Sequence, residues 1–209
     1  MKKLSNLTGP KLVAAVAVII CVVWTAANLI GFANEAVSRS SGKMQTVTLS
    51  AQDFQLIGIK DAANGGLIST DADPQMVLEC STKMARITLN CTFAIEPGEM
   101  VVYYTQKAGQ GFHPNKRYRF YATEDGSYTA DMPLRHIETI RIDPTNIAAN
   151  TMNVDSVVLN APKSFGQFFA VDAGDIFNLI LYSTLISALI TLSKEIFGGI
   201  FAKKSDKRG

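Results

Sequence analysis

Two long apolar segments, one near each end of the chain, constrain the fold more than any other feature of this sequence. The first runs from Leu12 to Ala33 without a charged side chain. About 20 helical residues cross the roughly 30 Å hydrocarbon layer of a bilayer, so this segment is long enough to span one. The sequence therefore predicts a transmembrane helix over residues 12–33.

The second apolar segment, from Ile176 to Leu192, is short for a straight span. It reaches the required length if the helix continues to residue 201, with Lys194 and Glu195 placed among the lipid headgroups. We therefore expect a second transmembrane helix over residues 176–201.

A cleavable signal peptide is the alternative for the first segment. Lys2 and Lys3 would form its basic region, and Gly31-Phe32-Ala33 would supply the small residues of a cleavage site. The apolar stretch is longer than the roughly 7–15 residues usual for a signal peptide, which favours an uncleaved anchor.

Basic residues gather outside the two apolar segments. Lysines precede the first segment, and the chain ends with Lys203, Lys204, Lys207 and Arg208. By the positive-inside rule, both termini are expected in the cytoplasm, with the middle domain extracytoplasmic. The tails are expected to contact anionic membrane lipid.

The overall net charge of +2 conceals an uneven distribution. Between residues 34 and 175, acidic side chains outnumber basic ones. A nucleic-acid-binding domain would present a basic surface, so nucleic acid is not expected as a partner.

Composition divides the chain into a series of segments, and the middle one has the usual size of a single folding unit. The expected segments are a cytoplasmic tail at 1–11, a transmembrane helix at 12–33, a linker at 34–43, an extracytoplasmic β-sandwich at 44–163, a linker at 164–175, a transmembrane helix at 176–201 and a basic cytoplasmic tail at 202–209.

The middle domain is expected to be mostly β. Short runs of alternating apolar and polar residues are separated by turn residues such as Glu96-Pro97-Gly98 and Glu124-Asp125-Gly126. This pattern favours an antiparallel β-sandwich. The runs are 45–49, 54–59, 76–80, 85–93, 100–105, 117–122, 127–132, 137–142 and 152–159.

Alternation along two of these runs predicts which side chains face the core. Tyr118 and Phe120 share one face of their run, and Ile140 and Ile142 share one face of theirs. We expect these side chains to be buried.

The three cysteines provide one candidate disulfide. Cys21 lies in the first apolar segment, whereas Cys80 and Cys91 fall on neighbouring predicted strands in a compartment that permits disulfides. A simple hairpin would not place residues 80 and 91 opposite each other, so the bond would need a bulge or a longer loop. The pairing of Cys80 with Cys91 stays open at this point.

Motifs of catalysis, metal binding and cofactor binding are not found. The sequence has no CxxC motif or Cys/His cluster typical of zinc, and no GxSxG, HExxH, P-loop or Rossmann motif. His113 and His136 lie far apart and are expected to be ordinary loop or surface residues. We therefore expect no catalytic residue, no metal and no cofactor.

Several short motifs follow one another in a familiar order between Asp71 and Asn160. They are Asp73-Pro74-Gln75, Val102-Tyr103-Tyr104-Thr105, Gly109-Gln110-Gly111-Phe112, Ile140-Arg141-Ile142-Asp143-Pro144 and Val154-Asp155-Ser156-Val157. In this order the chain resembles the jelly-roll, carbohydrate-binding-module-like domain found beside or within bacterial membrane glycosyltransferases of surface-polysaccharide synthesis. The resemblance implies a jelly-roll β-sandwich that binds glycan at the outer face of a bacterial inner (plasma) membrane.

The chain differs from that family because it contains no catalytic transferase domain. The resemblance therefore implies a non-catalytic accessory subunit that positions a bacterial surface glycan or a separate membrane glycosyltransferase. On this hypothesis Tyr104, Phe112 and Tyr121 stack on sugar rings. Arg141 and Asp143 would supply hydrogen bonds to the glycan.

Two other functions stay open. The chain could be a structural or assembly subunit of a larger membrane complex or homo-oligomer, with Asn28 facing a neighbouring helix. A small glycan-cleaving enzyme would instead need two carboxyl groups about 5–10 Å apart in a cleft. Glu124 with Asp125, or Asp71 with Asp73, would be its candidates, although both pairs lie in turn-like sequence.

Overall fold

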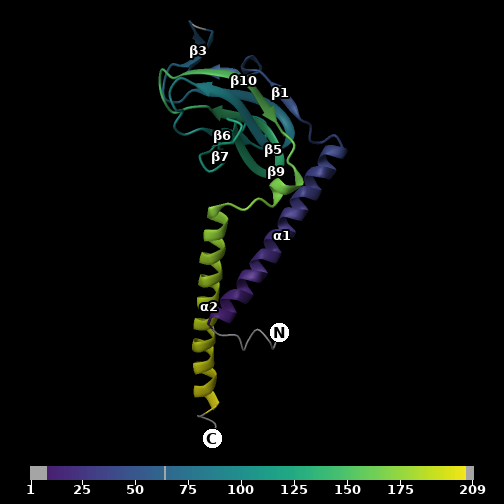
Figure 1. Ribbon diagram of the computed structural model, residues 1–209, viewed down its shortest axis with the longest axis vertical. Helices are drawn as coiled ribbons and strands as arrows, with labels where there is room; N and C mark the ends of the chain where they lie inside the picture. Colours follow the sequence, from purple (N-terminus) through teal and green to yellow (C-terminus); the bar gives the residue numbers. More distant parts are fainter. Residues whose placement is uncertain (1–8, 64, 206–209) are drawn as a thin grey trace. The chain divides into compact units, whose positions relative to one another are not determined.

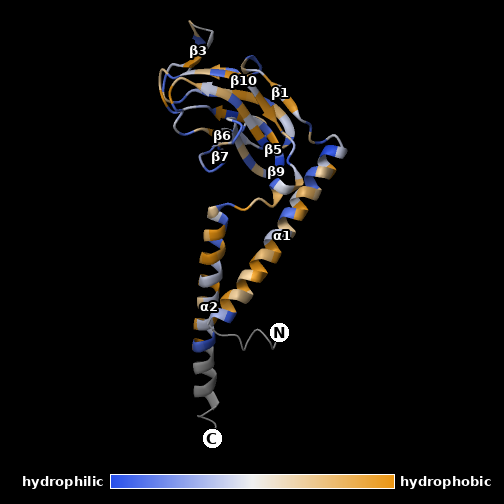
Figure 2. Cartoon of the chain, in the orientation of Figure 1, coloured by the Kyte–Doolittle hydropathy of each residue, from blue (hydrophilic) through white to orange (hydrophobic). Residues whose placement is uncertain are grey.

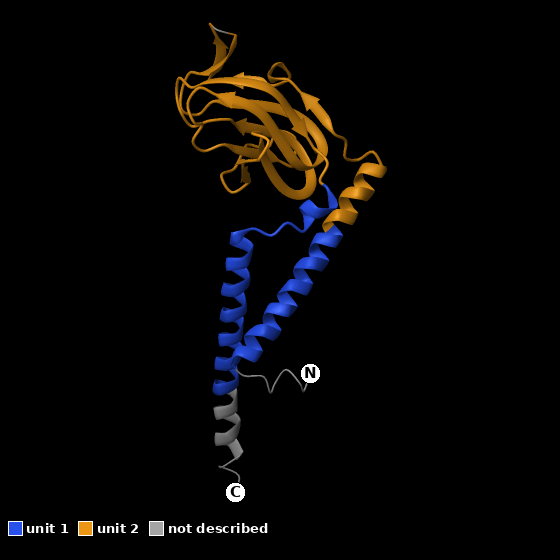
Figure 3. Ribbon diagram, in the orientation of Figure 1, with its two compact units in different colours: residues 1–30, 164–209 blue, residues 31–163 orange. Residues whose placement is uncertain are grey.

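The computed structural model describes residues 9–63 and 65–205, and for residues 197–205 only the backbone is considered. Four of the basic residues predicted to lie in the cytoplasm, Lys2, Lys3, Lys207 and Arg208, lie outside the described residues. The chain forms two units, a helical unit of residues 1–30 and 164–209 and a β unit of Gly31–Lys163 (Figure 3).

One long helix lies near each end of the described chain, and the strands lie between the two helices (Figure 1). The elements are α1 (Pro10–Ser40), β1 (Val47–Leu49), the 3-10 turn η2 (Ala51–Asp53), β2 (Gln55–Ile57), β3 (Ile59–Ala62), β4 (Gly66–Ser69), β5 (Gln75–Phe93), β6 (Val101–Thr105), β7 (Arg117–Arg119), β8 (Tyr121–Ala122), β9 (Tyr128–Asp143), β10 (Thr151–Leu159), the 3-10 turn η3 (Phe165–Phe168) and α2 (Ala173–Ser205).

Local sequence sets where both long helices begin. Pro10 opens α1, where its missing N–H would have had no helical partner. Before α2, the Asp172 carboxylate accepts the Asp175 N–H at 2.7 Å and the Asp175 carboxylate accepts the Asp172 N–H at 3.2 Å. These reciprocal bonds satisfy N–H groups that a helix start leaves free, so α2 begins a few residues before the apolar run.

Apolar residues occupy much of the described length of both helices (Figure 2), and many of their side chains are exposed. Val22 and Val23 of α1 are 61% and 62% exposed, and Ile180 of α2 is 62% exposed. By length and composition, α1 and the segment Phe165–Ile196 are able to cross a membrane, a property that signal sequences and core helices of soluble proteins share.

The end of α1 is part of the β unit. The helix continues through residues 34–40, which the sequence analysis expected to be a linker, and stops at Ser40. Gly42 follows with φ of +71°, a conformation that glycine adopts readily and that commonly ends helices. Met44, just beyond it, is 2% exposed, and its N–H donates to the Ser38 carbonyl at 3.1 Å.

The β unit is an antiparallel ten-stranded sheet. Its main order is β3-β4-β10-β5-β9-β6-β7, with β1 beside β10, β2 beside β5 and β8 beside β9. This confirms the prediction of an antiparallel, mostly β domain.

Two long strands, β5 and β9, run through both halves of this sheet. Near its start β5 lies beside β2, and from Ile87 onward it lies beside β10. Its pairing with β9 shifts register between Glu79 and Thr82 and again between Met84 and Arg86, and such bulges bend a strand. The two halves of the sheet thereby contribute to one core.

That core contains apolar side chains from both halves. Ile87, Leu89 and Val157 come from one half, and Ile140 and Ile142 from the other, and all are 0% exposed. The predicted inward face of Ile140 and Ile142 is confirmed. Phe120 is buried as predicted, and Tyr118 packs against the same core while partly exposed.

The alternating pattern predicted two strands in place of each of β5 and β9, and this prediction was wrong. Runs 76–80 and 85–93 are both parts of β5, and runs 127–132 and 137–142 are parts of β9. The polar residues between the runs resemble turns, but they lie at two bulges or, like Lys83 and His136, pair across the strands between those bulges. Pro133 lies at one bulge of β9, where a strand tolerates a residue that cannot donate a backbone hydrogen bond.

Candidate functional site

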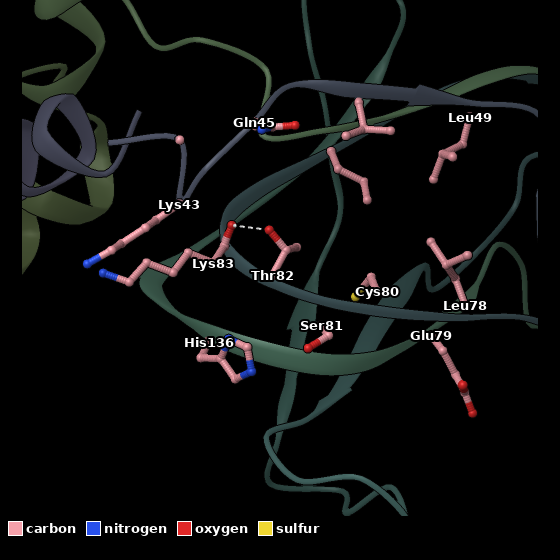
Figure 4. Close-up of a pocket in the computed structure, with 13 residues that line it drawn as sticks. Lys43, Gln45, Leu49, Leu78, Glu79, Cys80, Ser81, Thr82, Lys83 and His136 are labelled. Atoms are coloured by element: carbon pink, nitrogen blue, oxygen red, sulfur yellow. Dashed lines mark hydrogen bonds between the residues drawn. The ribbon is translucent and has the colours of Figure 1, made fainter. Parts of the chain in front are cut away.

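A cavity of about 650 Å³ opens beside the bend of β5, entirely within the β unit. This size falls within the roughly 300–1,000 Å³ typical of ligand pockets. Its walls come from the end of the α1 cap, from β1, from the bend of β5 and from β9 (Figure 4). The lining residues are Gly42, Lys43, Gln45, Val47, Leu49, Leu78, Glu79, Cys80, Ser81, Thr82, Lys83, His136 and Leu159.

The cavity exists because one edge of β5 is only partly paired. On this edge of β5, pairing with β2 reaches no further than Val77, and pairing with β10 begins only at Ile87. Between them, no described strand pairs with β5 on this side. Ser81 lies at the bend with φ of +34°, a conformation that non-glycine residues seldom adopt outside sites under constraint.

One buried side chain replaces the missing strand at the inner end of this gap. Asn160 is 0% exposed and has φ of +57°. Its amide oxygen accepts the Ala85 N–H at 3.0 Å, and its amide nitrogen donates to the carbonyls of Lys83 at 2.8 Å and Gln45 at 3.2 Å. The side chain thus satisfies β5 backbone groups that a neighbouring strand would otherwise pair.

The opposite wall is fixed by the end of α1. The Arg39 guanidinium and the Thr46 hydroxyl both donate to the Asn160 carbonyl, at 2.9 Å each. These bonds hold the segment between them, which carries Lys43 and Gln45, against the β5 gap.

The cavity combines an apolar part with hydrogen-bonding groups. Leu49, Leu78 and Leu159 supply apolar surface, and Gln45 and Ser81 supply polar groups that both donate and accept. The Lys43 and Lys83 side chains lie at one end of the cavity and extend in the same direction, with His136 on the neighbouring strand (Figure 4).

Two ionisable groups near the bend have shifted pKa values. The hydrogen bond from His136 at 2.7 Å, followed by one from Ser81, lowers the pKa of the Glu138 carboxyl. Burial, followed by the charge of Glu138, raises the pKa of the Cys80 thiol to about 11. Cys80 is therefore protonated near neutral pH and is not an activated nucleophile.

The predicted stacking residues do not line this cavity. Tyr104 is 5% exposed, and its ring stacks on Tyr118 with centroids 5.8 Å apart. Arg135 lies over the Tyr104 ring at 5.0 Å and donates to its hydroxyl. Tyr121 is 69% exposed on β8, and Phe112 is half-buried in the loop before β7.

The predicted polar pair, Arg141 and Asp143, does come together on β9. The Arg141 guanidinium donates to both Asp143 carboxylate oxygens, at 2.7 and 2.8 Å, and also to Asp73. It lies over the Tyr103 ring at 5.1 Å. Asp143 is 7% exposed, so this pair holds strand ends together rather than presenting free groups.

The candidate disulfide is not formed. Cys80 and Cys91 are free thiols, and both lie on β5. Eleven residues of one strand separate them, whereas a disulfide needs Cα atoms about 4.4–6.8 Å apart. The prediction placed them on neighbouring strands because it divided β5 in two.

The cavity residues had little sequence signal. Lys43 was assigned to a linker, Lys83 to a turn and His136 to the surface, and Asn160 marked only the end of a motif region. The polar interruption Ser81-Thr82-Lys83 within a β-rich stretch was the one available sign of a bend. Among the described residues, no group of three or more His, Cys, Asp or Glu side chains is arranged to hold a metal ion.

No protein-family model and no curated protein matches the chain, while fourteen solved chains do. A family 6 carbohydrate-binding module from Clostridium cellulolyticum with xylose is 8% identical, covering 55% of this chain and 97% of its own, with a TM-score of 0.39. A β-1,3-glucan-binding family 6 module from Bacillus halodurans is 12% identical, covering 57% and 97%, with a TM-score of 0.37.

A low-affinity xylan-binding module from Roseburia intestinalis is 12% identical, covering 55% of this chain and 94% of its own, with a TM-score of 0.36. The solved structures that the chain matches thus include several carbohydrate-binding modules. At these identities and TM-scores, the likenesses carry no argument about what this chain binds.

Proposed function

We propose that the chain is a non-catalytic glycan-binding protein that holds its ligand in the β5 cavity while α1 and α2 anchor it in a membrane. The cavity beside the bend of β5 carries this proposal, because it joins apolar surface to unpaired strand edge and polar side chains.

Sugars suit such a lining. A sugar ring has apolar C–H faces and a rim of hydroxyl groups that donate and accept hydrogen bonds. Leu49, Leu78 and Leu159 would contact a ring face, and Gln45, Ser81 and the open β5 edge would bond its hydroxyls. The volume of about 650 Å³ suits a short oligosaccharide.

The exposed apolar side chains of α1 and α2 support membrane anchoring, because such surface is otherwise left in water. If residues 12–33 span the bilayer, the part of α1 from Ala33 to Ser40 rises roughly 10 Å, at about 1.5 Å per residue. This part belongs to the β unit and ends at the cavity wall. The cavity would then lie close to the membrane surface.

The finer parts of the proposal follow from the sequence. The two halves of the sheet would form a jelly-roll β-sandwich, and the charged tails would place the β unit outside the cytoplasm. The ligand would be a bacterial surface glycan, and a separate membrane glycosyltransferase would be the partner. Purification in mild detergent, with a transferase recovered in constant ratio, would support that partner.

Filling the cavity tests the binding site. Full-length protein in phosphatidylcholine nanodiscs is screened against bacterial surface glycans, and we expect one glycan class to be retained. Val47 of β1 lines the cavity, so Val47→Trp should place an indole in it and reduce affinity at least about tenfold, or 1.4 kcal/mol.

The control is Thr48→Trp on the same strand. Successive side chains of a strand point to opposite faces, and Thr48 does not line the cavity. Thr48→Trp should retain binding. Absence of glycan binding by the unaltered protein, or equal loss in both variants, would contradict the proposal.

A further inference from the structure

We infer that the basic end of the cavity, formed by Lys43, Lys83 and His136, receives a phosphoryl group, and that this group is carried by a membrane lipid. The inference rests on the proposed function, because it specifies a charged group on the ligand of the same cavity. Binding of a glycan to the apolar part of the cavity does not require this charged group.

Three separate segments bring these groups to one cavity. Lys43 follows the cap of α1, Lys83 is on β5 and His136 is on β9. Lys83 and His136 are direct register partners, and cross-strand partners have Cβ atoms about 4.5–5.5 Å apart. Such a pairing of basic side chains offers no mutual stabilisation and is costly when both are charged.

Carboxylates do not neutralise the two lysines. Among the described residues, neither Lys43 nor Lys83 forms an ion pair, and Lys83 donates only to the Ser38 hydroxyl at 3.5 Å. Elsewhere in the sheet, Arg86 and Arg141 are paired with carboxylates at 2.7 Å. His136 has one acidic partner, Glu138.

The carbonyl groups at the end of α1 do not pair with the two lysines either. The Ser38 carbonyl accepts the Met44 N–H at 3.1 Å, and the Arg39 carbonyl accepts the Gly42 N–H at 3.0 Å. The backbone of the cap is therefore satisfied internally. The Lys43 and Lys83 side chains line one end of the cavity, and their ammonium groups extend from that end, away from Leu49 and Leu78, in a unit whose acidic residues outnumber its basic ones (Figure 4).

The type of cation favours phosphate. Lysine is a compact charge with three rotatable donors and is a common phosphate ligand, whereas planar carboxylates are bound best by the rigid fork of arginine. No arginine lines the cavity.

The position of the lysines favours a lipid as the source. Lys43 lies three residues beyond the end of α1, the helix proposed to leave the bilayer at Ala33. Lys43 is therefore separated from the proposed span by about ten residues of chain, a connection that favours a ligand held in the membrane. A soluble sugar phosphate has the same chemistry and is distinguished by experiment.

Lysine acetylation followed by mass spectrometry tests the inference. Full-length protein in phosphatidylcholine nanodiscs is labelled alone, with phosphatidic acid in the bilayer, or with soluble glucose 1-phosphate. We expect phosphatidic acid to slow labelling of Lys43 and Lys83 about tenfold, a ratio that corresponds to about 1.4 kcal/mol of free energy. Lys60 and Lys107, exposed lysines of the β unit outside the cavity, should label at an unchanged rate.

Each outcome has a defined meaning. Protection by glucose 1-phosphate alone would keep the phosphoryl site and overturn the lipid source. Protection by neither, or equal protection of Lys60 and Lys107, would overturn the inference. Glycan binding that Val47→Trp abolishes would still stand in that case, so failure of this inference is separable from failure of the proposed function.

A charge-neutralising variant gives a second measurement. Lys43→Gln with Lys83→Gln should remove the phosphatidic acid effect on deuterium exchange at residues 78–83. Lys60→Gln with Lys107→Gln changes the net charge equally and should leave it intact. Identical behaviour of the two double variants would contradict a specific site.

Discussion

At the scale of single residues, Asn160 has the largest structural task in the cavity. Its buried side chain serves one N–H and two C=O groups of the backbone. Water does not reach this site to replace them, because Asn160 is 0% exposed. Leaving buried polar groups without partners costs about 1–3 kcal/mol each before relaxation.

We therefore predict that Asn160→Ala lowers the free energy of unfolding by about 2–4 kcal/mol. Asn153→Ala is the matched control on β10, because Asn153 is exposed and its side chain donates to the nearby exposed Asp155. It should change stability by less than about 0.5 kcal/mol. Denaturant unfolding followed by near-ultraviolet circular dichroism measures both, and similar losses in the two variants would contradict this role.

The two thiols of β5 give a second prediction. Burial raises the pKa of Cys80 to about 11 and that of Cys91 to about 12. At pH 8 the Cys80 thiolate fraction is then about 100-fold below that of a thiol with the ordinary pKa of 9.0. Iodoacetamide should label both slowly in the folded protein, and faster as the pH approaches these values.

Unfolding without reductant completes that experiment. Both thiols should then alkylate fully, because neither is engaged in a disulfide. A peptide linking Cys80 to Cys91 in the mass spectrum would show the disulfide that the structure lacks.

At the scale of elements, the cap of α1 decides where one wall of the cavity lies. Gly42 has φ of +71°, and a Cβ added there would meet nothing within 4 Å. The cost of Gly42→Ala is therefore conformational, and we expect a loss of about 1 kcal/mol in unfolding free energy. Gly111→Ala, also in open space but without positive φ, should be nearly neutral.

Thermal unfolding distinguishes these two glycine variants. Equal melting temperatures for Gly42→Ala and Gly111→Ala would contradict the assigned cap. A drop confined to Gly42→Ala, with weaker glycan binding, would connect the cap to the cavity.

The elements also show how far the sequence predicts the fold. Alternation placed Ile140 and Ile142 correctly, because a side-chain period of two is a local property of a strand. It did not show that β5 and β9 are each continuous, because a bulge uses the same polar residues as a turn. A turn and a bulge differ only in which distant segments pair with the residues on either side.

The candidate site was less predictable than the fold for the same reason. Tyr104 was expected to face outward, whereas its ring is buried, stacks on Tyr118 and lies beside Arg135. The cavity depends on the stretch of β5 that neither β2 nor β10 pairs. That stretch is set by pairings between segments far apart in the sequence. The role of the named residues in glycan binding stays a prediction.

At the scale of the whole molecule, the account predicts a membrane topology. With both helices spanning the bilayer, protease added to intact spheroplasts should digest the β unit and leave epitope tags at both termini intact. Digestion of the tags with survival of the β unit would mean the opposite orientation. Release of the protein by carbonate would contradict anchoring by either helix.

Hydrogen–deuterium exchange of the full-length protein in nanodiscs, with and without bacterial surface glycan, tests whether the β5 cavity holds the glycan. We predict that the glycan slows exchange at residues 78–83 of β5, where the cavity leaves the strand edge unpaired. Slowing confined to the loop around Phe112 and to Tyr121, with residues 78–83 unchanged, would contradict the β5 cavity as the binding site.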